Sequence, residues 1–416
     1  MSTPDEADLS QSPVDPPLLK NRDFVLFVLG RTTNSMGVHA LTVSVGWHVY
    51  KMTGNPVDLG LIGLAQFAPA LALFLFAGMA ADQFNRRTII VICNIVHVIA
   101  VSLLIALFHF KAATVPAILT ILILHGAARS FFHTACQAIL PNLMSTHQFP
   151  RAVAIASSAN KAAQLLGPAL GGVLIAWLDE GVYTAIAFAF FASALAAVLL
   201  KRKLLVHARE PFSLETVVGG FLYVWRNKIV LGAVSIDLMA VLFGGVMGML
   251  PVFASDILHV GPEGLGLMRA MPGAGSLVVG IILTQLHAPR HMGPALFLSV
   301  AVFGLAIVTF SLSTTFWLSV AALAVYGCAD MISVYVRQTL VQIATPDAMR
   351  GRVSAVNSIS VNASNELGDF RAGIMAGGIG TAGAVLFGGI TTICVTALWW
   401  HLFPAIRKID RLGQHP

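Results

Sequence analysis

The sequence predicts an all-α integral membrane protein with twelve transmembrane helices in two pseudo-symmetric six-helix bundles. Composition, the succession of apolar stretches and an internal repeat support this prediction. Of the 416 residues, 57% are hydrophobic and only 11% are charged, whereas a soluble domain carries about 25% charged residues. Such a chain has too much apolar surface for a soluble exterior. The composition therefore argues against a soluble enzyme, a nucleic-acid-binding module and a disordered regulator.

Apolar stretches separated by polar residues define the expected spans, since a membrane-spanning helix needs about 20 mostly apolar residues. The spans are 24–49, 57–81, 88–110, 114–140, 149–178, 181–200, 228–253, 264–286, 293–312, 315–341, 351–379 and 381–403. Residues 18–200 and 228–405 are the two expected bundles, and residues 201–227 are a polar linker between them. Residues 1–17 and 406–416 are expected to be cytoplasmic tails, the first of them disordered.

Basic residues set the orientation of the spans, because cytoplasmic loops are enriched in Lys and Arg. With the N-terminus inside, 17 of the 25 Lys and Arg residues fall in cytoplasmic segments. Only Lys51 and Lys111 fall outside, and the rest lie within spans. This asymmetry predicts that both termini are cytoplasmic.

The two halves of the chain repeat each other at a shift of 201 residues. Gly126 coincides with Gly327, Gln137 with Gln338 and Arg151 with Arg352, without gaps. Such a repeat indicates two related six-helix units, which is common among secondary transporters.

Polar residues inside three otherwise apolar spans share one helix face each, since side chains recur every 3.6 residues. They predict a common polar cavity for a substrate. The residues are Arg31, Ser35 and His39 in the first span, His125, Arg129 and His133 in the fourth, and Tyr326, Ser333 and Arg337 in the tenth. The alternative is that each charge satisfies a local structural pair, such as Glu366 with Arg371.

Ionisable residues at membrane depth are costly and are usually functional or paired. Asp330 is the favoured proton-coupling residue because the repeat places it at the same position as Arg129. The two side chains are expected to face each other across the cavity. Asp237, Glu366 and Asp369 are the competing candidates.

Sequence motifs give no sign of enzymatic or metal chemistry. No nucleotide-binding loop, nucleophile elbow or His-Glu-x-x-His zinc motif is present. Cys93, Cys136, Cys328 and Cys394 lie in apolar stretches without metal-binding spacing, so they are expected to be buried thiols. We therefore expect no enzyme activity, no cofactor and no metal.

Two motifs suggest gates. In the expected loop after the second span, Gly78 is followed by Asp82, Arg86 and Arg87. In the fifth span, Pro168 stands between Gly167 and Gly171, a pattern that lets a helix bend and pack closely. The loop resembles the signature loop of the major facilitator superfamily, although Gln83 and Asn85 depart from it. The fifth-span motif resembles that of proton-coupled efflux members.

Further segments, including Pro141-Asn142-Leu143 and Ser364-Asn365-Glu366, resemble the enterobactin-exporter-like branch, the transmembrane secretion effectors. The resemblance implies the major facilitator fold in a bacterial inner membrane. It also implies proton-driven export of a siderophore-like or drug-like small molecule by alternating access. The implied partners are that molecule, protons and the lipid bilayer, with no nucleic acid and no obligate protein partner. Import or facilitated diffusion of a small metabolite is the alternative, and a membrane-embedded enzyme is a weaker one.

Overall fold

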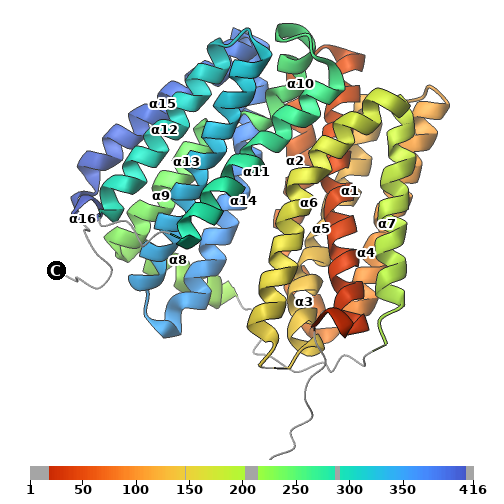
Figure 1. Ribbon diagram of the computed structural model, residues 1–416, viewed down its shortest axis with the longest axis horizontal. Coiled ribbons are helices and arrows are strands. Elements are labelled where there is room, and N and C mark those ends of the chain that lie inside the picture. Colours follow the sequence, from red (N-terminus) through yellow and green to blue (C-terminus); the bar gives the residue numbers. More distant parts are fainter. Residues whose placement is uncertain (1–17, 146, 202–213, 286–290, 409–416) are drawn as a thin grey trace, which may run out of the picture.

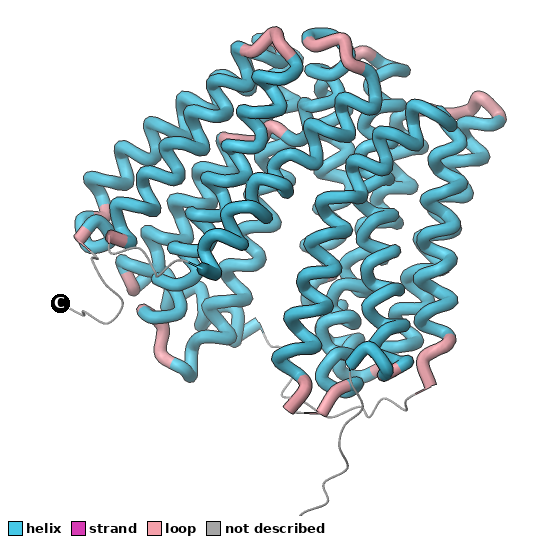
Figure 2. Tube along the Cα trace, viewed as in Figure 1, coloured by secondary structure: helices cyan, strands magenta, loops and turns pink. Residues whose placement is uncertain are grey.

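The computed structural model describes residues 18–145, 147–201, 214–285 and 291–408, and these form helices and short connections without a β-strand (Figure 2). The first half contains α1 (Arg22–Thr53), α2 (Pro56–Ala72), α3 (Phe74–Gln83), α4 (Arg86–His109), α5 (Val115–Leu143), α6 (Phe149–Leu178) and α7 (Val182–Val198). The second contains α8 (Leu214–Arg226), α9 (Lys228–Phe243), α10 (Leu250–Val252), α11 (Gly261–Gln285), α12 (Met292–Leu312), α13 (Phe316–Ile343), α14 (Asp347–Ile379), α15 (Thr381–Leu402) and α16 (Pro404–Arg407). The 3₁₀ turns are η2 (Leu18–Lys20), η3 (Asp179–Gly181) and η4 (Met247–Met249), and η5 (Phe253–Ile257) is a π-helical turn.

The helices belong to a multi-pass membrane protein. Within the described residues, eight segments are long and apolar enough to cross a bilayer, or nine when the bent pair α2–α3 is counted as one span. One of the eight runs through both α6 and α7. The segments do not include α1 and α14, the two longest helices, because these carry many polar residues. Large apolar side chains such as Phe188, Leu298 and Trp317 are exposed, as expected for a surface that faces lipid.

Asparagine side chains fix several helix starts. Asn21, Asn55, Asn85 and Asn227 each accept a hydrogen bond from a backbone N–H in the first turn that follows. These bonds satisfy amide groups that have no partner within the helix. At the other end of α1, Gly54 adopts φ 61°, a left-handed conformation that ends the helix.

The region of the first gate motif differs from the loop expected there. Residues Gly78 to Gln83 continue as helix α3, so only Phe84 and Asn85 separate it from α4. The expected single span is instead bent by 54° between Pro56–Ala72 and Phe76–Gln83, after Pro69 has removed one backbone donor. A side chain at Gly78 would have open space around it, so this glycine does not serve close helix packing.

Three further expectations need correction. The seventh expected span is not one continuous helix, because α9 ends at Phe243 and the chain passes through η4, α10 and η5 before α11. Residues Lys228–Ile257 together are nevertheless long and apolar enough to cross a bilayer. The expected polar linker contains the helix α8, whose apolar residues recur at helical spacing. Cys394 is exposed, whereas Cys93 and Cys136 are buried as expected.

Within each half the packing follows the internal repeat. In the first half α5 packs on α2 and α4, and α1 packs on α6 and α7; in the second, α13 packs on α11 and α12. Gly126 of α5 has no room for a side chain beside the α2 backbone at Gln66. Its repeat counterpart Gly327 has none beside the α11 backbone at Pro272. The duplicated glycines therefore perform the same packing role in the two halves.

The two halves meet at one end, where α2 packs on α14 and α6 packs on α11 (Figure 1). There Gly60 lies against Gly373, and Gly172 lies against Gly266, backbone to backbone. This end carries the loop at Gly54 and the turn η3, so it is the predicted periplasmic end. Toward the opposite, predicted cytoplasmic end the halves diverge (Figure 1).

Candidate functional site

A cavity of about 130 Å³ lies between the two halves. The first half contributes residues of α1, α2 and α5, and the second contributes residues of α10, α11, α14 and the η4 turn. The lining residues are Val38, His39, Thr42, Gly46, Leu59, Ile62, Gly63, Gln66, Arg129, Gly248, Pro251, Arg269, Glu366 and Asp369. A small polar chamber shared by both halves is thus present in the middle of an apolar body.

Four charged side chains line this cavity, and we call them the cavity charges: Arg129, Arg269, Glu366 and Asp369. Arg129 comes from the first half, and the other three come from the second. All four are half-buried, and their formal charges cancel. Within the described residues no ion pair closer than 4 Å joins any two of them, so they interact through space across the chamber.

Glu366 reaches toward the other half. Its Oε2 lies 3.3 Å from the position that a Cβ would take at Gly63 of α2. Arg129 is the opposite charge with the strongest electrostatic effect on Glu366. Asp369 is placed differently, because its carboxylate lies against Gly248 of its own half, with Cγ 3.0 Å from the position that a Cβ would take there. Glu366 is therefore the carboxylate that faces a cation of the opposite half.

Arg269 was not among the expected site residues, although its charge within an apolar span was a signal for it. Its Nη2 donates to the Met247 carbonyl at 3.0 Å, which directs the guanidinium from α11 toward the cavity. Gln66, a buried amide on the otherwise apolar α2, is a second lining residue that the sequence interpretation missed.

A second charged cluster lies wholly inside the second half. Arg337 of α13 pairs with Asp237 of α9 at 3.2 Å and donates to Asn357 Oδ1 of α14 at 2.7 Å. Arg337 is 2% exposed and Asp237 is 5% exposed. We call these three residues the α9–α13–α14 cluster. Its direct contacts and deep burial are those of a structural ion pair.

Asp330 lies with that cluster and not with Arg129. The charges that act on Asp330 are those of Asp237, Arg337 and Lys161. Among the described residues that line the cavity Asp330 is absent, so the expected pair of Arg129 and Asp330 facing each other is not found. The repeat places the two residues at equal depth, but their helix faces meet different neighbours. Ser333 is buried, and Tyr326 packs on Phe303 with 4.3 Å between ring centres.

The polar stripes of the first half divide between the cavity and the core. His39 lines the cavity beside Arg129, and Arg31 lies near His133, further along toward the predicted cytoplasmic end. Ser35 is half-buried on α1 between them. His125 is fully buried in the first half, with its ring centre 4.4 Å from that of His97, so it belongs to the core and not to the cavity. The helical period predicts which residues share one face of a helix. It does not predict which neighbouring helix covers that face.

The second gate motif lies where α6 contacts two other helices. Gly167 and Gly171 lie against the α1 backbone at Met36 and Ala40, and Gly172 lies against α11. Pro168 is buried inside α6, which nevertheless runs unbroken from Phe149 to Leu178. The motif thus lets one helix touch both its own half and the other half.

Residues of the first gate motif lie at the predicted cytoplasmic end. Asp82 is half-buried in the last turn of α3, and Arg86 is buried at the start of α4. Arg87 donates to the Val198 carbonyl at the end of α7. The alternative pair of Glu366 with Arg371 is not formed, because Arg371 donates to the Leu242 and Phe243 carbonyls at the end of α9.

At the predicted periplasmic end, two hydrogen bonds join the halves. The Tyr50 hydroxyl of α1 donates to the Asp256 carboxylate of η5, and Lys51 Nζ donates to Ser255 Oγ at 3.0 Å. No pattern of spacing predicts these contacts, since their partners are 206 and 204 positions apart in the chain. They form a polar latch over the glycine contacts.

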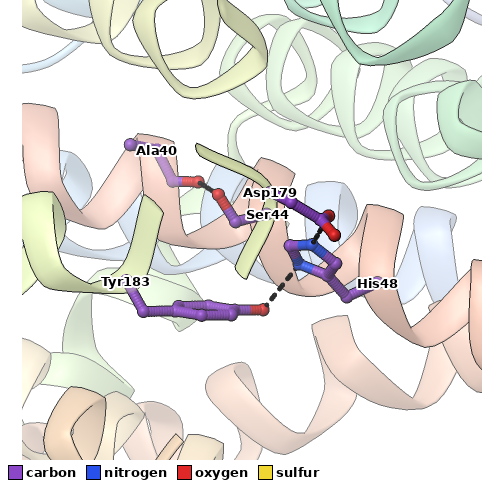
Figure 3. A network of polar contacts seen from close by, with 5 residues as sticks. All are labelled: Ala40, Ser44, His48, Asp179 and Tyr183. Carbon is purple, nitrogen blue, oxygen red and sulfur yellow. Dashed lines mark hydrogen bonds and ion pairs between the residues drawn. The ribbon is translucent and has the colours of Figure 1, made fainter. Parts of the chain in front are cut away.

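A neighbouring network stays inside the first half. The His48 Nδ1 lies 3.0 Å from the Tyr183 hydroxyl, and its Nε2 lies 3.2 Å from Asp179 Oδ1 (Figure 3). This network ties α1 to the turn between α6 and α7. It lines a second cavity of about 370 Å³ that includes Trp47, Lys51 and Glu180.

An apolar helical body that shares one charged chamber between two repeated halves is the architecture of a membrane transporter. The family model of the transmembrane secretion effectors matches residues 12–416, and the chain belongs to that family. It is accordingly a transporter of the major facilitator type and not an enzyme.

Relatives of similar length agree with this assignment. The chain is 26% identical over 363 residues to the enterobactin exporter EntS of Citrobacter koseri, covering 85% of this chain and 84% of that one. It is 23% identical over 369 residues to the staphyloferrin A transporter of Staphylococcus aureus, covering 86% and 91%. It is also 24% identical to the MFS-type transporter YfiS of Bacillus subtilis, covering 92% and 94%.

Solved structures agree in fold. The nucleoside transporter NupG has a TM-score of 0.76 at 12% identity and covers 92% of this chain and 100% of that one. A bacterial homologue of the lysosomal transporter Spinster, in an inward-facing and unoccupied conformation, has a TM-score of 0.73 at 15% identity, covering 95% and 99%.

Proposed function

We propose that this chain is a proton-coupled exporter that moves a siderophore-like small molecule by alternating access across a bacterial inner membrane. Residues 18–200 and 228–405 act as two bundles of six spans each, with both termini in the cytoplasm. The relatives named for enterobactin and staphyloferrin A support a siderophore-like substrate. Two arginines in the cavity suit the carboxylate or catecholate oxygens of such a molecule.

The observation that carries the proposal is that Glu366 and Arg129 face one cavity from opposite halves. When the halves rock, the distance between these two charges changes. A nearby cation lowers the proton affinity of a carboxylate, and a drier environment raises it. Proton affinity at Glu366 therefore differs between the two facing states, which is what coupling requires.

The other carboxylates are less suited to coupling because their closest charged partners lie in their own half. Asp237 is paired directly with Arg337, and Asp369 lies against Gly248 with Arg269 and Arg371 of its own half as the charges that act on it. Asp330 lies beside Asp237 and Arg337, although Lys161 of the first half also acts on it. Asp330 is therefore the second candidate.

The test uses proteoliposomes with a pH-sensitive dye inside and enterobactin added as the probe substrate. Wild-type protein should move protons against substrate, and Glu366→Gln should lower this proton flux at least tenfold while retaining substrate exchange. The matched control is Asp347→Asn, an exposed carboxylate in a local pair with Arg350, and it should behave as wild type. Loss of coupling in Asp330→Asn but not in Glu366→Gln would transfer the role to Asp330. Substrate and protons moving in the same direction would favour import instead.

The gates follow from the same scheme. In this scheme the structure, closed at the predicted periplasmic end, corresponds to the inward-facing state, and Asp82, Arg86 and Arg87 would close the cytoplasmic end in the other state. Asp82→Ala should therefore lower the transport rate several-fold without lowering the amount of protein in the membrane. Gln83→Ala, one residue further and exposed, is the control. An unchanged rate in Asp82→Ala would remove the gating role.

A further inference from the structure

The helix α8 carries an apolar stripe that no described part of the chain covers. Val218, Phe221, Leu222 and Trp225 are spaced i, i+3, i+4 and i+7, so they share one face of the helix. Their exposed fractions are 62%, 59%, 47% and 65%. Four large apolar side chains in a row would be unfavourable in water.

The opposite face of α8 fixes the helix to the protein. A side chain at Gly220 would collide with the α14 backbone at Arg352, and Val224 is buried in the hydrophobic cluster of the second half. The Tyr223 hydroxyl donates to the Ala344 carbonyl at 2.8 Å, at the end of α13. The helix therefore sits at the predicted cytoplasmic ends of α13 and α14 (Figure 1). Because the opposite face is the packed one, the exposed stripe faces away from these two helices.

Length excludes a spanning role for α8. Its 13 residues extend about 20 Å at 1.5 Å per residue, short of the roughly 30 Å hydrocarbon core. A short helix with one apolar and one packed face, attached to a membrane-embedded body, fits the plane of the membrane interface. The amphipathic ring of Trp225 suits the same depth.

Basic residues lie at the C-terminal end of α8 and on the helix on which it packs. Arg226 and Lys228 follow it directly, and Arg350 and Arg352 begin the helix α14 on which α8 packs. All four are exposed. Asp347 is a nearby exposed carboxylate, and it pairs with Arg350 at 2.7 Å. The surface therefore has an excess of positive charge, which complements anionic lipid headgroups.

We propose that α8 lies in the headgroup region of the cytoplasmic leaflet and binds anionic lipid. Its apolar stripe enters the acyl boundary, and Arg226 and Lys228 contact the phosphates. The partner is the lipid surface itself, and because α8 is bonded to α13 and α14, that surface holds the cytoplasmic ends of two helices of the second half.

Hydrogen exchange of the full chain in nanodiscs tests this directly, without a transport assay. The amides of residues 214–226 should exchange at least fivefold more slowly in nanodiscs with phosphatidylglycerol than in pure phosphatidylcholine, and this difference should shrink at high salt. The variant Arg226→Gln with Lys228→Gln should lose the difference. The control Lys111→Gln, which removes an exposed charge at the opposite end, should keep it.

A second variant, Phe221→Ser with Trp225→Ser, separates insertion from charge. It should raise exchange of the same amides in both lipids while leaving peptides of α13 unchanged. Equal protection in detergent and in both lipids would mean that another part of this chain covers the stripe. Protection that rises with protein concentration would mean that a second copy covers it. Either result would overturn the lipid proposal, and neither bears on proton coupling.

Discussion

The α9–α13–α14 cluster and the cavity charges place similar residues in different situations. Asp237 and Arg337 are almost fully buried, belong to one half and touch at 3.2 Å. Arg129 and Glu366 are half-buried, belong to opposite halves and face a cavity without direct contact. In the proposed cycle, a charge pair inside one half would keep its geometry, whereas the distance between charges of opposite halves would change. We therefore expect the charges of the α9–α13–α14 cluster to stabilise the fold and the cavity charges to respond to a movement between the halves.

The largest expected effect comes from breaking the pair inside one half. Arg337→Met leaves Asp237 buried without its partner, which should lower the free energy of unfolding by about 3–5 kcal/mol. Thermal unfolding in detergent and the amount of protein in the membrane measure this. Adding Asp237→Leu to Arg337→Met removes the uncompensated charge, so the double variant should recover much of the stability. No recovery would mean that the bond to Asn357, and not the ion pair, holds the three helices.

Removing one of the two charges that face each other across the cavity should instead lower the transport rate. Arg129→Gln removes the cation that faces Glu366 and should lower the transport rate by about 10–100-fold, which corresponds to roughly 1.4–2.7 kcal/mol. Unfolding temperature should change little, because Arg129 has no direct ion pair to lose within the described structure. Arg151→Gln, an exposed arginine in the same half, is the control for removing one positive charge. A large loss of stability in Arg129→Gln would assign Arg129 to the fold.

The smallest expected effect is on the closure of the predicted periplasmic end, where one tyrosine joins the two halves and another does not. Tyr50 bonds across the halves to Asp256, and Tyr183 bonds within the first half to His48. Tyr50→Phe should destabilise the closed end by about 1 kcal/mol, a shift of roughly fivefold in the balance of facing states. Tyr183→Phe should leave that balance unchanged.

Spin labels at Gln83→Cys and Gly351→Cys, in a cysteine-free background, measure this balance as a distance between the two halves. Both positions are exposed at the predicted cytoplasmic end. Equal distance distributions in the two tyrosine variants would mean that the latch adds nothing to closure.

Helix positions and polar faces could be predicted from the sequence, because apolar length and the 3.6-residue period determine them. Arg129 and His39 indeed line the cavity. The neighbour of each face could not be predicted. Asp330 shares a repeat position with Arg129, yet the charges that act on it are those of Asp237, Arg337 and Lys161 and not that of Arg129. A repeat in the sequence fixes the depth of a residue along its helix, but the packing of the neighbouring helices decides what its side chain meets.

Helix α8 could be predicted from the sequence. The spacing of Val218, Phe221, Leu222 and Trp225 is that of an amphipathic helix. The basic residues that flank it, considered alone, favour a polar linker over residues 201–227. The same basic residues favour an interfacial helix when the apolar spacing is considered with them.

The glycine contacts that close the predicted periplasmic end have a consequence for the work needed to open it. Gly60 against Gly373, and Gly172 against Gly266, bring backbones together without burying large side chains. Separating the glycine contacts themselves exposes little apolar area. Most of the cost of opening this end therefore comes from the hydrophobic cluster that the two halves share, which includes Tyr50 and Leu59 of the first half and Leu250 and Phe253 of the second. Tipping a two-state balance from one extreme to the other takes about 5.5 kcal/mol of differential binding. In the proposed cycle, the differential binding of a proton or substrate would have to offset the exposure of this shared cluster, because the glycine contacts add little to the cost.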